Sequence, residues 1–390
     1  MNSEELESLR QAALRALAPI RPTDSNTKAD KCFLLNGKKT EAGRQLQPYY
    51  LVYFLLVDLL GFKNLGRFEK IDWSIPIDFN GQAYLVEYGK FGLSLFAHDP
   101  EMEEAATKEI VVRINKAVKS ARNYFDFLAL QAVEQSKINV KNNSIPLRDR
   151  YDFLRSEYDS KLDEIKLLDE AHAFDLKQRK LPFGMYLFSP SYAKKEEANW
   201  LAISAIEAFF SWTEHVMIHV AVLRGAVNSA REVADLAADD WPKKFKAAFN
   251  LKDPTEKILF DRALSLRQDL RNFIAHGAFG KQGEAFSFHS TAGAVPVLLP
   301  HKRGSKKFSL SEQLDFDTYA AFDVVEDFTS LLWAGDRAPA RLYVQESCLP
   351  TILTFAADGT YMAAMVSLES MKELIDQLTY QIDQAANMDW

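Results

Sequence analysis

Cysteine is scarce in this sequence, and so are the motifs that hold metals, phosphates or acyl intermediates. The 390 residues include 2 cysteines, Cys32 and Cys348, whose separation matches no metal-ligand or redox spacing. This usage favours a reduced, intracellular compartment. The sequence also lacks a glycine-rich phosphate loop, a serine nucleophile elbow and a Cys/His zinc cluster. We therefore expect neither a cofactor nor a metal site.

Long apolar runs and an excess of positive charge are missing as well. The longest apolar run, Tyr49–Leu60, is interrupted by Asp58 and is too short to span a bilayer. Residues 1–19 contain no apolar signal core. We therefore expect a cytoplasmic protein with no membrane segment. The net charge of −7 argues against a surface coated with non-specific nucleic-acid contacts, although it leaves room for a local basic groove.

The patterning predicts an α+β chain that is predominantly α-helical. A chain of 390 residues exceeds the usual size of one compact domain, so we expect several regions. They are an N-terminal α+β region, a long helical hairpin, a helical domain with a β insertion, and a C-terminal hairpin with a final helix: 1–98, 99–175, 192–340 and 341–390.

Two dipeptides mark predicted hairpins. Asn80–Gly81 separates two stretches of alternating polarity within 71–88, which is a strong hairpin signal, and a third strand follows. Asp358–Gly359 predicts a second hairpin within 341–365 by the same reasoning. The N-terminal region therefore combines helices with a small antiparallel sheet.

The helical signals are strongest in the middle of the chain. One helix is expected from Thr40, as its cap, to Leu60. Two long antiparallel helices are expected over 100–173, with a break at 142–146. The helix 198–223 is apolar around most of its circumference, which we interpret as a packing surface for a second copy of the chain.

A helix that opens at Pro254 ends in the sequence Arg-Asn-Phe-Ile-Ala-His-Gly. Five positions separate Arg271 from His276, which places the two side chains about 140° apart on a regular helix. They converge only because arginine is long and because Gly277 ends the helix at His276. A histidine at a helix C-terminus is also favoured electrostatically without any function, and the bare spacing is common. Asn272, directly after the arginine, makes the pattern more specific.

This ending and the upstream helix 206–215 resemble the HEPN superfamily, small helical domains many of which cut RNA without a metal. The resemblance covers about 195–280 and implies a HEPN-like helical bundle. It also implies that Arg271 binds phosphate, that His276 moves protons, and that Asn272 orients either partner. These residue types suit such roles, because arginine is permanently charged and histidine titrates near neutrality. Glu207, on the facing helix, is a weaker acidic candidate.

The function that the resemblance implies is a metal-independent endoribonuclease, of the toxin or phage-defence kind. One histidine does not easily serve as both acid and base, so we expect a homodimer that acts on RNA, with an antitoxin or another regulatory partner. Some HEPN toxins carry a tyrosine, modified by the antitoxin, where this chain has Ala278, so that form of control is not supported. The alternative is a non-catalytic HEPN-like dimeric interaction or nucleotide-sensing module.

A basic run follows the predicted β insertion. The run is either a solvated loop or a set of contacts to an RNA backbone, and both interpretations stay open. Its four cationic residues are Lys302, Arg303, Lys306 and Lys307.

Two further groups resemble metal sites. His215 and His219 are one helical turn apart, a spacing that can hold a metal, but two packed histidines are the better interpretation. Asp78, Glu87 and Lys90 resemble a metal-dependent nuclease core. Two residues rather than one separate Glu87 from Lys90, so a regular strand puts them on opposite faces and hairpin structure is favoured.

Overall fold

The computed structural model describes most of the chain, and it divides into two compact units. Unit 1 comprises residues 1–135 and 377–390, and unit 2 comprises residues 136–376. The described residues are 1–178, 191–276, 286–291, 293–298, 307–308 and 318–386.

Unit 1 contains a five-stranded antiparallel sheet in the order β1-β3-β4-β5-β2. The predicted hairpin is confirmed: β3 pairs with β4 across a turn in which Asn80 and Gly81 have φ of 54° and 83°. The third predicted strand is β5. The strands are β1 (Arg21–Pro22), β2 (Lys38–Lys39), β3 (Ile71–Phe79), β4 (Gln82–Gly89) and β5 (Gly92–Ala97).

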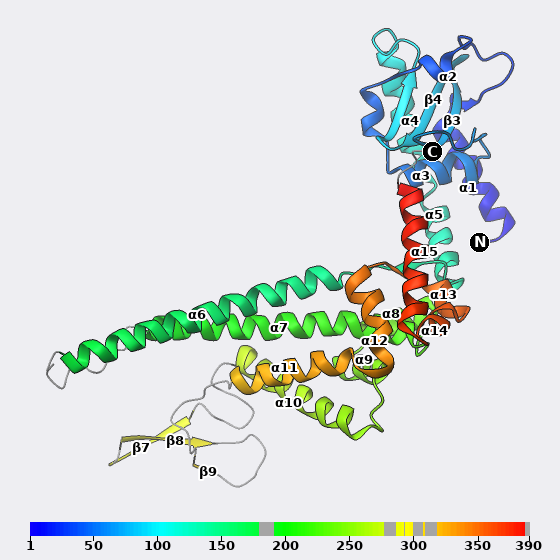
Figure 1. Cartoon of the computed structure of the whole chain (residues 1–390). Coiled ribbons are helices and arrows are strands. Elements are labelled where there is room, and N and C mark those ends of the chain that lie inside the picture. Colours follow the sequence, from blue (N-terminus) through cyan, green and yellow to red (C-terminus); the bar gives the residue numbers. More distant parts are fainter. Residues whose placement is uncertain (179–190, 277–285, 292, 299–306, 309–317, 387–390) are drawn as a thin grey trace. The chain divides into compact units, whose positions relative to one another are not determined.

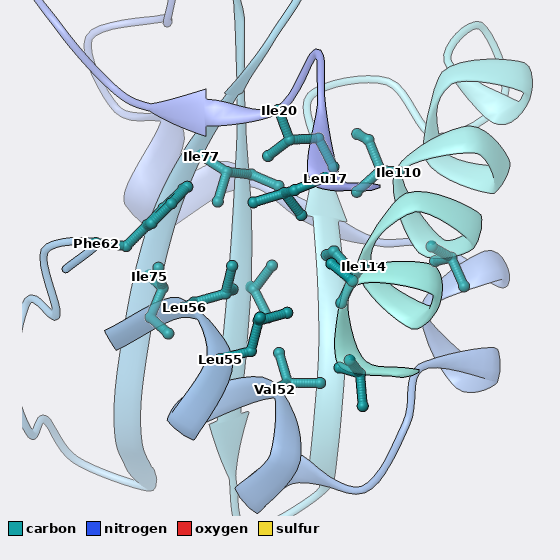
Figure 2. Close-up of a cluster of buried hydrophobic side chains, with 14 of the residues drawn as sticks. Leu17, Ile20, Val52, Leu55, Leu56, Phe62, Ile75, Ile77, Ile110 and Ile114 are labelled. Atoms are coloured by element: carbon teal, nitrogen blue, oxygen red, sulfur yellow. The ribbon is translucent and has the colours of Figure 1, made fainter. Parts of the chain in front are cut away.

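Helices supply the other half of the unit 1 core. Figure 2 shows Ile75 and Ile77 of β3 against Leu55 and Leu56 of a helix on the same side of the sheet. Alternation along β3 directs these isoleucines to one face, and all four side chains are 0% exposed. The helices of unit 1 are α1 (Ser3–Leu17), α2 (Phe33–Asn36), the 3₁₀ turn η1 (Ala42–Gln45), α3 (Tyr49–Tyr53), the π-helical turn η2 (Phe54–Leu59), α4 (Glu104–Ser120) and α5 (Arg122–Glu134).

The helix predicted from Thr40 to Leu60 is divided in two. The Thr40 hydroxyl accepts a hydrogen bond from the Gly43 N–H at 3.2 Å, but the 3₁₀ turn η1 begins after Glu41 and ends at Gln45. Helix α3 then begins after Pro48, whose backbone is extended. A proline at this position favours the start of a new helix rather than the continuation of the old one. Gly61, with φ of 73°, follows the end of η2 as predicted.

Unit 2 is predominantly helical. Figure 1 shows its two longest helices, α6 (Ser144–Gln178) and α7 (Tyr192–Leu223), side by side. The sequence predicted that the helices within 99–175 pack against each other as a hairpin. Instead, α6 packs against α7, and the residues of α4 and α5 belong to unit 1. The other helices of unit 2 up to the C-terminal segment are α8 (Ala230–Ala238), α9 (Trp241–Ala248), α10 (Pro254–His276) and α11 (Thr318–Leu332).

Helix α7 is apolar around most of its circumference because other helices of unit 2 pack against most of its sides. Helices α6, α9 and α11 all pack against it. Its Phe209 and Phe210 meet aromatic rings of neighbouring helices, including Phe328 of α11 at 5.4 Å and Trp241 of α9 at 5.8 Å between ring centroids. Most of the apolar surface that suggested a second copy of the chain is therefore covered within one chain, although Trp200 stays 62% exposed.

The hairpin predicted around Asp358–Gly359 is wrong. The dipeptide joins two short helices, α13 (Leu353–Ala357) and α14 (Thr360–Ala364). Asp358 Oδ1 accepts hydrogen bonds from the Thr360 N–H at 2.9 Å and from its hydroxyl at 2.6 Å, so the aspartate stabilises the link between the two helices instead of turning a hairpin. The strand nearby, β10 (Thr351–Ile352), pairs with the distant β6 (Asn139–Val140).

The remaining elements agree with the predicted α+β class. The β insertion after α10 is confirmed by a three-stranded antiparallel sheet. The elements are β7 (Phe286–Ser290), β8 (Gly293–Leu298), β9 (Lys307–Phe308), the 3₁₀ turn η4 (Gly335–Arg337), α12 (Ala338–Arg341), the π-helical turn η5 (Leu342–Ser347) and the predicted final helix α15 (Leu368–Ala386). No helix in the described ranges is both long and apolar enough to cross a membrane.

Candidate functional site

Helix α10 is fixed at its start by an aspartate cap. Asp253 Oδ1 accepts from the N–H groups of Thr255 and Glu256 at 2.7 and 3.3 Å, and Pro254 occupies the first helical position, where no N–H is needed. An apolar stripe then faces the core of unit 2, with exposed fractions of 0–8%: Leu259, Phe260, Ala263, Leu266 and Leu270. Arg267 and Arg271, four residues apart, lie one turn from each other beside this stripe.

Helix α7 has a narrow polar face in its otherwise buried middle section. Glu207 and Ser211 are exposed and Glu214 is half-buried, whereas most residues between them are buried. The spacing of four and then three residues keeps these side chains on one side of the helix. The polar face is thus the part of this section that the other helices of unit 2 leave uncovered.

The polar face of α7 and the arginines of α10 border one cleft. It has a volume of about 410 Å³. Among the described residues, those that line it come from these two helices: Glu207, Phe210, Ser211, Glu214, Arg267, Leu270 and Arg271. The structure therefore brings Glu207 and Arg271, two of the residues predicted from the sequence, to the same cleft.

The charges at one end of this cleft are paired. Glu214 accepts from the ammonium group of Lys244 at 2.7 Å and lies 2.7 Å from a terminal nitrogen of Arg267. The Lys244 side chain is only 6% exposed, so its charge needs this carboxylate. Glu214 thus holds two cations, and together these three residues leave one positive charge at this end of the cleft.

Arg271 is the cation without such a partner. Within the part of the chain that the structure describes, neither Arg271 nor Glu207 takes part in an ion pair. Arg271 is exposed. A guanidinium group that projects into a cleft without a carboxylate partner is available to bind a phosphate.

The other predicted residues of this site are only partly covered by the structure. Asn272 and His276 belong to the last turns of α10, but their side chains lie outside the described part of the protein. Of the basic run, Lys302, Arg303 and Lys306 lie outside the described residues. The backbone of Lys307 is in β9, opposite Leu298.

Glu214, Arg267 and Lys244 were not singled out from the sequence. The sequence signal that could have found Glu214 and Arg267 is helical spacing. Arg267 is one turn from Arg271, and Glu214 is two turns from Glu207. Lys244 lies on a different helix, and no local pattern connects it with Glu214.

The two histidines of α7 bind each other and the protein. His219 is 1% exposed, and its Nε2 lies 3.1 Å from Nε2 of His215. His215 Nε2 also accepts from the Asn143 N–H at 2.8 Å, and His219 Nδ1 lies 2.6 Å from the Thr351 hydroxyl. Burial, followed by the neighbouring His215, lowers the pKa of His219 to about 3. Among the described residues, no group of three or more His, Cys, Asp or Glu side chains is placed to hold a metal.

Two of the nuclease-like residues of unit 1, Asp78 and Glu87, accept hydrogen bonds from different groups. Asp78 is buried, where it accepts from the Thr27 hydroxyl at 2.7 Å and the Gly81 N–H at 2.9 Å. Glu87 instead accepts from the Ser74 hydroxyl at 3.0 Å, and Ser74 is four positions from Asp78 along β3. Both carboxylates therefore have hydrogen-bond partners within unit 1.

No protein-family model, curated protein or solved structure matches this chain.

Proposed function

We propose that unit 2 is a metal-independent endoribonuclease that cuts RNA at the cleft between α7 and α10. The observation that carries the proposal is the position of Arg271, an exposed guanidinium in a cleft, with no ion-pair partner in the described structure. The resemblance to HEPN ribonucleases at Arg271–Gly277 supports the same assignment. On this proposal the protein acts as a toxin or phage-defence effector.

The reaction needs only groups that this chain supplies. The 2′-hydroxyl oxygen attacks the adjacent phosphorus, the O2′–P bond forms, and the P–O5′ bond breaks. A base takes the hydroxyl proton and an acid supplies a proton to the leaving 5′-oxygen, while Arg271 stabilises the charge on the phosphoryl oxygens. We assign the proton steps to His276 and the orientation of the phosphate to Asn272. Glu207 borders the same cleft as Arg271 and is the weaker acidic candidate.

A second copy of the chain would complete the proton transfers. One histidine supplies either the base or the acid at a given moment, so two facing sites let one His276 accept a proton while the other donates one. Because unit 2 covers most of the apolar surface of α7 by itself, the need for two histidines is the reason for proposing a homodimer. The cations Lys302, Arg303, Lys306 and Lys307 are proposed to bind the RNA backbone.

The experiment compares Arg271→Gln and His276→Ala with Arg262→Gln, using RNA in excess EDTA. Arg262 lies on the same helix but pairs with Asp327 at 2.5 Å, and it does not line the cleft. Loss of cleavage in the first two variants, with the activity of Arg262→Gln retained, supports the proposal. Near-wild-type cleavage by Arg271→Gln or His276→Ala overturns the assignment. RNA binding without any cleavage by the wild-type protein favours the non-catalytic module.

A further inference from the structure

Unit 2 contains a second cavity, which is lined by different residues from the cleft of Arg271. Its volume is about 440 Å³, within the range of small-molecule sites. Its residues come from α6, α7, α11 and the segment 333–345, and they carry two positive charges and no negative one: Arg148, Trp212, Thr329, Ser330, Trp333, Arg341 and Gln345.

Arg148 is held in place before any ligand binds. Its Nε donates to both carboxylate oxygens of Asp152, at 2.9 and 3.1 Å. The guanidinium carbon also lies 4.9 Å from the ring centroid of Tyr151 and 5.0 Å from that of Trp212. Stacking and the Nε bond fix the plane of the group, while its two terminal NH₂ groups have no acceptor among the described residues.

Gln345 is oriented by the buried indole of Trp212. Trp212 is 0% exposed, and its Nε1–H donates to Gln345 Oε1 at 3.0 Å. An indole N–H only donates, so the amide oxygen of Gln345 must face it. The amide NH₂ group is the end that remains without an acceptor in the described structure, which adds a neutral donor to the cavity.

Arg341 provides the second cation at the edge of the cavity. Its Nε lies 3.2 Å from Glu346, and its side chain is 57% exposed. As with Arg148, a carboxylate outside the cavity lining holds the Nε side of the group. Two guanidinium groups that share one cavity repel each other, and a bound anion removes that cost.

An aromatic surface lies beside these donors. Trp333 is half-buried and meets Trp212 edge to face, with 6.3 Å between ring centroids. Its indole has no hydrogen-bond acceptor in the described part of the chain. The cavity therefore combines an excess of hydrogen-bond donors, positive charge and a partly exposed planar ring.

We propose that this cavity binds a nucleoside monophosphate, with the phosphate on Arg148, Arg341 and Gln345 and the base against Trp333. A phosphate supplies only acceptors, and it matches the planar fork of arginine. A base stacks on an indole independently of its hydrogen-bonding edge. The proposal is independent of the RNA-cleaving function, because the two sites have no lining residue in common among those that the structure describes.

The chain provides a matched control for this site. Arg155 lies on the same helix as Arg148, and its Nε donates to Asp159 at 3.1 and 3.0 Å. It lies 4.0 Å from the ring centroid of Phe322, and its side chain is 27% exposed, against 26% for Arg148. Arg155 does not line the cavity. A general effect of losing a stacked arginine from α6 should therefore appear in both variants.

The test is titration calorimetry of the full chain with AMP, UMP, adenosine and inorganic phosphate. We expect AMP or UMP to bind, inorganic phosphate to bind more weakly, and adenosine not to bind detectably. Arg148→Gln and Arg341→Gln should each weaken nucleotide binding at least about tenfold, the size expected for losing a charge-assisted hydrogen bond. Arg155→Gln should bind as the wild type does.

Three results would overturn the assignment. The first is no binding of either nucleotide. The second is unchanged affinity in both Arg148→Gln and Arg341→Gln. The third is equal affinity for phosphate and nucleotide with no effect of Trp333→Leu, which removes the base from the proposal. Circular dichroism of each variant, compared with Arg155→Gln, separates loss of binding from loss of folding.

Discussion

At the scale of single residues, unit 2 contains a buried ion pair that connects two distant segments. The Arg337 side chain is 4% exposed, and one terminal nitrogen lies 2.7 Å from Glu256. The same guanidinium donates to the carbonyl oxygens of Leu331 and Leu332 at 2.7 and 3.2 Å. Every nitrogen of the group therefore has an acceptor, which is the condition under which a buried arginine is tolerated.

Replacing Arg337 by Met should destabilise unit 2 strongly, because it leaves the Glu256 carboxylate buried without its cation. Removing one partner of such a pair costs about 3–5 kcal/mol. Arg262→Met breaks the exposed pair with Asp327 and should cost less than about 1 kcal/mol. Urea unfolding followed by tryptophan fluorescence measures both free energies. Similar costs for the two variants would show that the buried pair contributes nothing beyond an exposed one.

The histidine pair of α7 should make the stability of unit 2 depend on pH. Burial lowers the pKa of His215, and the pKa of His219 falls to about 3. In the unfolded chain both titrate near 6.5, so below that pH the unfolded state binds more protons than the folded state. The free energy of unfolding should be independent of these groups above pH 6.5. It should then fall as the pH decreases, by at most about 1.4 kcal/mol per pH unit for each histidine.

Unfolding at pH 7 and pH 5 measures this dependence, since few carboxylates titrate in that window. His219→Gln removes one titrating group, so the difference between the two pH values should become smaller, whatever the stability of the variant itself. An unchanged difference would mean that His219 is not held neutral in the folded protein.

At the scale of elements, the sequence predicted the local structure correctly where a single dipeptide or a single spacing of apolar residues determines it. Asn80–Gly81 needs two positive φ angles, and few alternatives to a hairpin satisfy that requirement. Asp358–Gly359 is a similar turn dipeptide, but here Asp358 Oδ1 accepts hydrogen bonds from the N–H and the hydroxyl of Thr360, the first residue of α14, and the dipeptide links two helices. The difference lies in the burial of Tyr361, which is 0% exposed and whose hydroxyl lies 2.9 Å from that of Tyr343. That tertiary contact has no local signature.

The N-terminal sheet depends on a close backbone approach at the end of β4. A Cβ added to Gly89 would lie 2.1 Å from the Lys70 carbonyl oxygen, whereas one added to Gly81 would meet no atom within 4 Å. Gly89→Ala should therefore destabilise unit 1 more than Gly81→Ala. The latter should cost only the strain of a positive φ, about 1 kcal/mol. Thermal unfolding of the two variants tests this order, and equal melting temperatures would contradict the contact with Lys70.

At the scale of the whole molecule, the sequence predicted the class of fold but not which segments pack together. The helices over 100–173 were predicted as partners, yet α6 packs on α7 and the rest belongs to unit 1. Arg271 and Glu207 were singled out from local patterns in the sequence, and the structure places both at one cleft. The donor-rich cavity was not predicted from the sequence. Arg148 and Arg341 lie near opposite ends of the sequence of unit 2, and only the fold brings them together.

The most direct test of the central claim is cleavage of an RNA with a single 2′-deoxy sugar at the cut site. If the 2′-hydroxyl is the nucleophile, the all-RNA substrate is cut in excess EDTA and leaves a 2′,3′-cyclic phosphate and a 5′-hydroxyl. The substituted substrate then stays intact at that position. Cleavage of the substituted substrate, or a requirement for added Mg²⁺, would contradict the assignment of the reaction to Arg271 and His276.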